Sequence, residues 1–181
     1  MDWGTLIATG SGGLIAISGT VLADFLRHRH ENDRTVEARR RAVYNEFIVA
    51  TGTCHTRLRE LAQGRGEQGD LETASRAALT DAGIYDVRER LFIEGSTTVA
   101  GAGQAMFVQL RALRRVVATG AAQDSPAYHA VYHPYLAAVW GYRAAVREEL
   151  DGRPLVPADF GWAEWGGRDS CAVCRAAGAA D

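Results

Sequence analysis

Residues 34–62 read RTVEARRRAVYNEFIVATGTCHTRLRELA, and this stretch decides the fold class because its apolar residues recur with the period of an α-helix. Their spacing in sevens, fours and threes places them on one face of a helix. The members of this apolar stripe are Val36, Val43, Phe47, Ala50, Cys54, Leu58 and Leu61. The pattern predicts a long helix that buries one face, with Cys54 as a small core residue.

Two further helices are expected in the middle of the chain. Asp70 is a good N-cap for a second helix that extends to about residue 93, with Gly83 as a weak point in its middle. Gly95 followed by Ser96 ends that helix and begins a third, which stops before Gly120. The expected buried stripes are Leu71, Ala74, Ala78, Tyr85 and Phe92 in the second helix, and Val99, Met106, Leu110, Leu113 and Val117 in the third.

A fourth helix is expected from residue 126 to about residue 151. Pro126 suits a first helical turn, whereas Pro134 should kink the helix. Its stripe is Tyr128, Tyr132, Tyr135, Val139, Tyr142 and Val146. No stretch alternates with period two, and the connections are short. The sequence therefore predicts an all-α fold in which an N-terminal transmembrane helix continues into an antiparallel four-helix bundle with an irregular C-terminal tail.

The membrane prediction comes from residues 3–26, an apolar stretch with no charge before Asp24. As a helix, its first 21 residues would reach roughly 32 Å, close to the thickness of a bilayer core. Only Met1 and Asp2 precede it, so the basic segment of a cleavable signal peptide is missing. We therefore predict an uncleaved single-pass anchor at residues 1–26, a helical bundle at 27–152 and a tail at 153–181.

Basic residues after this stretch predict the topology. The membrane-proximal arginines are Arg27, Arg29, Arg34, Arg39, Arg40 and Arg41. Arginines this near a span stay on the cytoplasmic side, so the N-terminus should lie outside and the body in the cytoplasm. They either contact anionic lipid or only set the topology. A net charge of −2 argues against nucleic acid as a partner.

Small residues recur every fourth position within the predicted anchor and lie on one face of the helix. They are Gly4, Ala8, Gly12, Ala16 and Thr20. Small residues let two helices approach closely in lipid, which predicts a homo-oligomer. The alternative is that these residues reflect a composition with 20 glycines in 181 residues.

The tail contains Phe160, Trp162 and Trp165, for which three interpretations stay open. The aromatic residues either pack on the bundle, contact the membrane surface at the headgroup level, or belong to a disordered segment.

Motifs for catalysis are missing from the sequence. There is no G-x-S-x-G elbow, no P-loop and no H-E-x-x-H. The GRGEQG at 64–69 follows a helix and not a strand, so it predicts a flexible turn and not a dinucleotide site. We expect no catalytic residue and no organic cofactor.

One cysteine pair could carry chemistry. Cys171 and Cys174 have the two-residue spacing that suits either zinc or a reversible disulfide. The remaining zinc ligands would be His129 and His133, which are four residues apart on one helix face, or a second cysteine pair from another subunit. The interpretation that the sequence favours is an incidental pair in a mobile tail, with a zinc site and a thiol redox site as alternatives.

The Trp-Gly-Thr start at residues 3–5, the apolar stretch, the RRRAVYNEF at 39–47 and the segment 136–150 resemble small single-pass membrane-anchored helical proteins of actinobacteria that have no assigned activity. The resemblance implies a membrane-tethered helical domain and transfers no functional residue.

The leading functional hypothesis is a non-enzymatic, membrane-anchored interaction or scaffold protein that oligomerises or recruits an unknown protein partner at the cytoplasmic face. The first alternative is a metal- or thiol-dependent sensor that uses Cys171 and Cys174. The second is an oligomeric effector that permeabilises membranes through its small-residue face.

Overall fold

The computed structural model of this chain describes residues 34–64 and 70–178. The chain divides into two compact units, residues 1–41 and 42–181. The described residues of the first unit, 34–41, are helical, and there the Arg41 guanidinium pairs with the Glu37 carboxylate at 2.6 Å. Arg34, Arg39 and Arg41 are exposed and Arg40 is half-buried.

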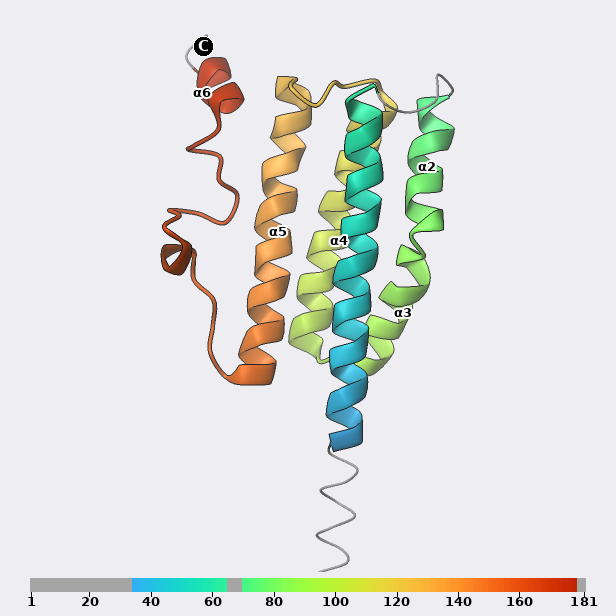
Figure 1. The fold of residues 1–181 in the computed structure, drawn as a ribbon, viewed down its shortest axis with the longest axis vertical. Helices are drawn as coiled ribbons and strands as arrows, with labels where there is room; N and C mark the ends of the chain where they lie inside the picture. Colours follow the sequence, from blue (N-terminus) through green and yellow to red (C-terminus); the bar gives the residue numbers. More distant parts are fainter. Residues whose placement is uncertain (1–33, 65–69, 179–181) are drawn as a thin grey trace, which may run out of the picture. The chain divides into compact units, whose positions relative to one another are not determined.

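The second unit is a helical bundle, and the described residues contain no strand, so the all-α prediction is confirmed. Its elements are the helix at 42–62, α2 (Leu71–Asp81), α3 (Ile84–Glu94), α4 (Thr97–Ala118), α5 (Pro126–Asp151), the 3₁₀ turn η1 (Pro157–Phe160) and α6 (Ala172–Gly178). In Figure 1 the 42–62 helix, the pair α2 and α3, α4, and α5 lie side by side and run in alternating directions. The most extensive helix contact among the labelled elements joins α4 and α5.

The helix starts follow the predicted capping residues. The Asp70 carboxylate accepts the backbone N–H groups of Glu72 and Thr73 at the start of α2. Ser96 and Ser125 cap α4 and α5 in the same way, each through its hydroxyl oxygen. These side chains satisfy N–H groups that the first helical turn leaves without an intrahelical acceptor.

The predicted second helix is two helices, because the chain breaks at Gly83. This residue has a φ of +62°, a left-handed conformation that glycine adopts without steric cost. The break changes which face of the helix points to the core, so α3 buries Ile84 and Leu91. The predicted stripe is therefore wrong in α3, where Tyr85 and Phe92 are 46% and 38% exposed.

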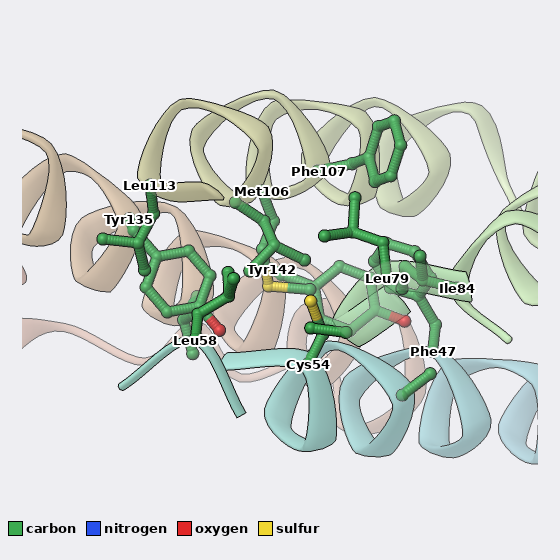
Figure 2. Close-up of a cluster of buried hydrophobic side chains, with 14 of the residues drawn as sticks. Phe47, Cys54, Leu58, Leu79, Ile84, Met106, Phe107, Leu113, Tyr135 and Tyr142 are labelled. Atoms are coloured by element: carbon green, nitrogen blue, oxygen red, sulfur yellow. The ribbon is translucent and has the colours of Figure 1, made fainter. Parts of the chain in front are cut away.

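The core fills the space between these helices (Figure 2). Phe47, Cys54 and Leu58 point into it from the 42–62 helix, and Met106 and Tyr142 meet them from α4 and α5. Cys54 has no exposed surface, as its place in the stripe predicts, and burial raises the pKa of its thiol to about 12. Among the described residues, every buried hydrophobic side chain lies between positions 43 and 142.

The predicted anchor and its small-residue face lie outside the described residues, as do Arg27 and Arg29. Among the helices that the structure does describe, none combines the length and the apolar character that a membrane span needs. Of the GRGEQG sequence only Gly64 is described, at the end of the 42–62 helix.

Candidate metal centre

The C-terminal segment, residues 153–178, returns along α5 after Gly152 ends that helix (Figure 1). An aromatic contact attaches it midway: the Trp165 ring stacks on the Trp140 ring with centroids 4.8 Å apart and planes 4° from parallel. Phe160 and Trp162 also contact Trp140, at centroid distances of 5.2 and 5.1 Å. The structure therefore packs the predicted tail aromatics on the bundle, although Phe160 and Trp162 stay 44% and 43% exposed.

His129 and His133 lie one turn apart on α5, in the part of the helix that faces this segment. His133 is buried and His129 is half-buried. The Nδ1 atom of His129 lies 3.5 Å from the Nε2 atom of His133. The two rings thus direct one nitrogen each toward a common point, as the spacing of four residues predicts.

The backbone of the C-terminal segment orients His133. Its Nδ1 lies 2.5 Å from the carbonyl oxygen of Gly166. Because a carbonyl oxygen only accepts, Nδ1 carries the proton and the Nε2 lone pair faces His129. A carbonyl that holds the far nitrogen of a histidine in this way is the usual outer partner of a metal-binding imidazole.

Gly166 can make this contact because it has no side chain. A Cβ atom there would lie 3.2 Å from the backbone oxygen of His133, closer than an ordinary van der Waals contact. Among residues 153–176, whose burial the structure describes, Gly166 is the only one that is fully buried. A glycine at this point lets the segment approach the α5 backbone closely enough to reach the histidines.

The two cysteines complete the group. Cys171 immediately precedes α6, and its carbonyl accepts the backbone N–H of Arg175. Its Sγ lies 3.2 Å from the Nδ1 of His129. With Cys174 one turn further on, one donor atom from each of the four residues lies within 4.8 Å of the other three. We call His129, His133, Cys171 and Cys174 the His–Cys cluster.

Electrostatics differ between the two thiols. Hydrogen bonds, above all from the backbone N–H of Cys174, lower the pKa of the Cys171 thiol to about 6. Burial, followed by the neighbouring Cys171 sulfur, raises the pKa of Cys174. Both thiols would lose their protons as ligands of a bound cation, and the lowered pKa favours this loss at Cys171.

The donor spacing suits a tetrahedral ion. Zinc takes nitrogen ligands at about 2.0–2.1 Å and sulfur ligands at about 2.3 Å, so neighbouring donors in a tetrahedron are roughly 3.4–3.8 Å apart. The nitrogen–nitrogen distance of 3.5 Å and the sulfur–nitrogen distance of 3.2 Å lie near this range. Two imidazoles and two thiolates suit zinc, whereas harder ions such as Mg²⁺ prefer oxygen ligands.

Comparisons bring no further information on this site. No protein-family model, curated protein or solved structure matches the chain. The roles of the four residues rest on their geometry.

The structure brings all four predicted metal-site residues together within one chain, so a second cysteine pair from another subunit is not needed. Gly166 and Trp140 were not predicted from the sequence. The signal for the first was the Gly-Gly pair at 166–167 shortly before the cysteines, and the signal for the second was a tryptophan on the fourth helix outside its predicted stripe.

Proposed function

We propose that this protein is a metal-dependent interaction module in which a zinc ion bound by the His–Cys cluster fixes the C-terminal segment on α5. The observation that carries the proposal is the convergence of four donors within 4.8 Å. They come from parts of the chain that are far apart, since 42 residues separate His129 from Cys171. Two imidazoles and two thiolates form one of the ligand sets of structural zinc sites.

The metal would control docking of the C-terminal segment and not folding of the bundle. The buried core of the described residues ends at Tyr142, so residues 153–178 contribute no buried hydrophobic side chain to it. In small zinc domains the ion and the fold are inseparable, because little else holds the chain together. Here the bundle keeps its core without the ion, and loss of zinc would free only the segment.

Release of the segment would expose an aromatic surface. Trp140 on α5 would lose its contacts with Trp165, Trp162 and Phe160. Tryptophan and phenylalanine are the residues that protein interfaces use most effectively. We propose that a protein partner binds this face when zinc is absent, which makes the module a metal-dependent sensor.

The remaining parts of the proposal come from the sequence. We propose that residues 1–26 anchor the module in the cell membrane, that the arginines which follow keep its body in the cytoplasm, and that the small-residue face of the anchor forms a homo-oligomer. In this arrangement the protein would be a scaffold at the cytoplasmic face of the membrane, and the zinc concentration would decide whether the partner binds.

The test is metal analysis of the full-length protein, purified in detergent without chelator. We expect one zinc per chain and, after exchange with cobalt(II), the absorption bands of a tetrahedral site with thiolate ligands. Removal of zinc with a chelator should shift the tryptophan emission to longer wavelength, because Trp140 and Trp165 become exposed to water. Cys54→Ala is the matched control, because it removes a cysteine that is fully buried away from the cluster. A protein that binds no zinc, or binds it equally well after Cys171→Ser, contradicts the proposal.

A further inference from the structure

Besides binding a metal, the two sulfurs of the His–Cys cluster have the arrangement of a dithiol. Cys171 and Cys174 are separated by two residues at the start of α6, and their Sγ atoms lie within 4.8 Å of each other. Both side chains are half-exposed. The third cysteine of the chain, Cys54, has no exposed surface. Thiol chemistry with a reagent in solution is therefore confined to the pair.

An open approach leads to the cluster. A surface hollow of about 580 Å³ is lined by His129, Val173 and the turn before α5. His129 contacts the Cys171 sulfur at 3.2 Å, so a small molecule in the hollow is one side chain away from the donor atoms. A peroxide, which is no larger than a few water molecules, needs no opening of the bundle to reach the site.

We propose that the Cys171–Cys174 pair is a redox switch: a peroxide oxidises the two thiols to a disulfide, the metal leaves, and the C-terminal segment is released from α5. This inference rests on the proposed function, because it adds a second way of emptying the same site. The disulfide would remove both sulfur ligands at once, and the two histidines that remain cannot close a tetrahedral site.

The chemistry balances with the peroxide as the only oxidant. The Cys171 sulfur attacks one peroxide oxygen, the O–O bond breaks, and the other oxygen leaves as hydroxide or alkoxide and takes up a proton to form water or an alcohol. The Cys174 sulfur then attacks the sulfenic sulfur of Cys171, the S–S bond forms, and the S–OH oxygen leaves as water. Two sulfurs lose two electrons, the peroxide gains them, and the ion leaves without change of charge.

Geometry assigns the order of the two steps. The Cys171 sulfur contacts His129, which lines the hollow, and this contact favours Cys171 as the first sulfur to react. Cys174 follows one helical turn later and is placed to resolve the sulfenic acid. Without Cys174, the oxidised Cys171 should persist as a sulfenic acid that a dione reagent can trap.

The experiment treats the zinc-loaded, full-length protein with hydrogen peroxide and follows three quantities: zinc released to a coloured chelator, free thiols by alkylation and mass spectrometry, and hydrogen exchange in residues 153–178. We expect one zinc released per chain, loss of two thiols with a Cys171–Cys174 linkage, and at least about tenfold faster exchange in the segment. A thiol reductant with added zinc should reverse all three. Cys54→Ala should behave like the parent, and Cys174→Ser should yield trapped Cys171.

The outcomes separate the two proposals. If the protein binds zinc but keeps it under peroxide, or if oxidation proceeds to sulfinic acid with no Cys171–Cys174 disulfide, the redox switch is wrong and the metal-dependent module stands. If the protein binds no zinc, the proposed function is wrong, and with it the release step. Release of zinc without faster exchange in residues 153–178 overturns the link between oxidation and undocking.

Discussion

Two polar clusters contact α5, one near its last turn and one near its first, and they differ in how hydrogen-bond donors and acceptors are matched. At the last turn, the Tyr44 hydroxyl donates to the Glu149 carboxylate at 2.9 Å and accepts the backbone N–H of Ser96 at 3.1 Å. The Ser96 hydroxyl donates to the same carboxylate. We call Tyr44, Ser96 and Glu149 the Tyr44 network.

In the Tyr44 network each of these acceptors faces a donor, so the cluster is complete with the residues present. In the His–Cys cluster, a nitrogen or sulfur atom from each of four residues lies within 4.8 Å of the others, and each of these atoms is a potential metal ligand. Neutral imidazole nitrogens and deprotonated thiols offer lone pairs that one cation can bind together. The comparison teaches how a structural network differs from a ligand site: the first matches donors with acceptors, and the second collects potential metal ligands.

The largest expected effect tests the ligand side of the comparison. Cys171→Ser and His133→Ala should each lower zinc affinity by at least about 100-fold, because loss of a direct ligand exceeds the 10–100-fold that an outer partner costs. The stability of the zinc-free bundle should stay unchanged, since neither side chain belongs to the hydrophobic core. Competition with a chelator of known affinity measures the first quantity, and chemical denaturation measures the second. A variant that unfolds the zinc-free bundle would show that the His–Cys cluster is a structural network and not a ligand site.

Removal of one hydroxyl tests the structural side. Tyr44→Phe should lower the free energy of unfolding by about 1–3 kcal/mol, because it removes one hydrogen-bond donor from the half-buried Glu149 carboxylate and takes the hydroxyl acceptor from the backbone N–H of Ser96. Zinc affinity should not change. The matched control is Tyr128→Phe, since the Tyr128 hydroxyl is buried with no hydrogen-bond partner among the described atoms. That variant should be as stable as the parent or more stable. An equal loss of stability in Tyr44→Phe and Tyr128→Phe would show that the hydrogen bonds of Tyr44 do not stabilise the fold.

Docking of the C-terminal segment can be weakened without touching a ligand. Gly166→Ala places a Cβ atom 3.2 Å from the His133 backbone oxygen and pushes away the carbonyl that orients the ring. We expect zinc affinity to fall by about tenfold, as for other outer partners. Gly141→Ala on α5, where a Cβ atom would meet no neighbour within 4 Å, should leave the affinity unchanged. Equal affinities for the two variants would mean that the segment does not need this close approach.

The smallest effect concerns a third histidine that belongs to neither cluster. Burial, followed by the nearby Arg59 charge, lowers the pKa of His55 from 6.5 to about 4, and its ring stacks on Tyr132 and Tyr135. The unfolded chain takes up this proton first as the pH falls, so the free energy of unfolding decreases from about pH 6.5 toward about pH 4. For His55 we expect about 1 kcal/mol between about pH 7.5 and about pH 5.5.

His55→Leu, measured in chelator beside the parent, should remove this part of the pH dependence. The titration of the His–Cys cluster is common to both proteins and cancels in the difference. An unchanged slope would show that His55 is protonated in the folded protein.

Much of the bundle could be predicted because local physics determines it. The stripe from Val43 to Leu58 is buried as its period requires, and Asp70, Ser96 and Ser125 cap the helices that they precede. The predicted stripe of α3 was wrong because the left-handed Gly83 changes which face of the following helix points to the core. A periodicity that is counted across Gly83 does not include this rotation.

The ligands of the candidate site could be predicted, but their convergence could not. The i, i+4 histidines and the C-x-x-C pair are visible in the sequence. Their approach depends on Trp165 stacking on Trp140 and on Gly166 contacting the α5 backbone, both of which are tertiary contacts. For this reason the sequence favoured an incidental pair, whereas the structure gives the pair two histidine neighbours.

The separation of 42 residues between His129 and Cys171 also sets an order in time. A ribosome adds roughly 5–20 residues per second, so the cysteines are made several seconds after the histidines. The histidines are therefore made while only half of the ligand set exists. Two histidines alone cannot close a tetrahedral site. In our proposal the ion is thus retained only after the C-terminal segment has been made, and each new molecule begins in the zinc-free state.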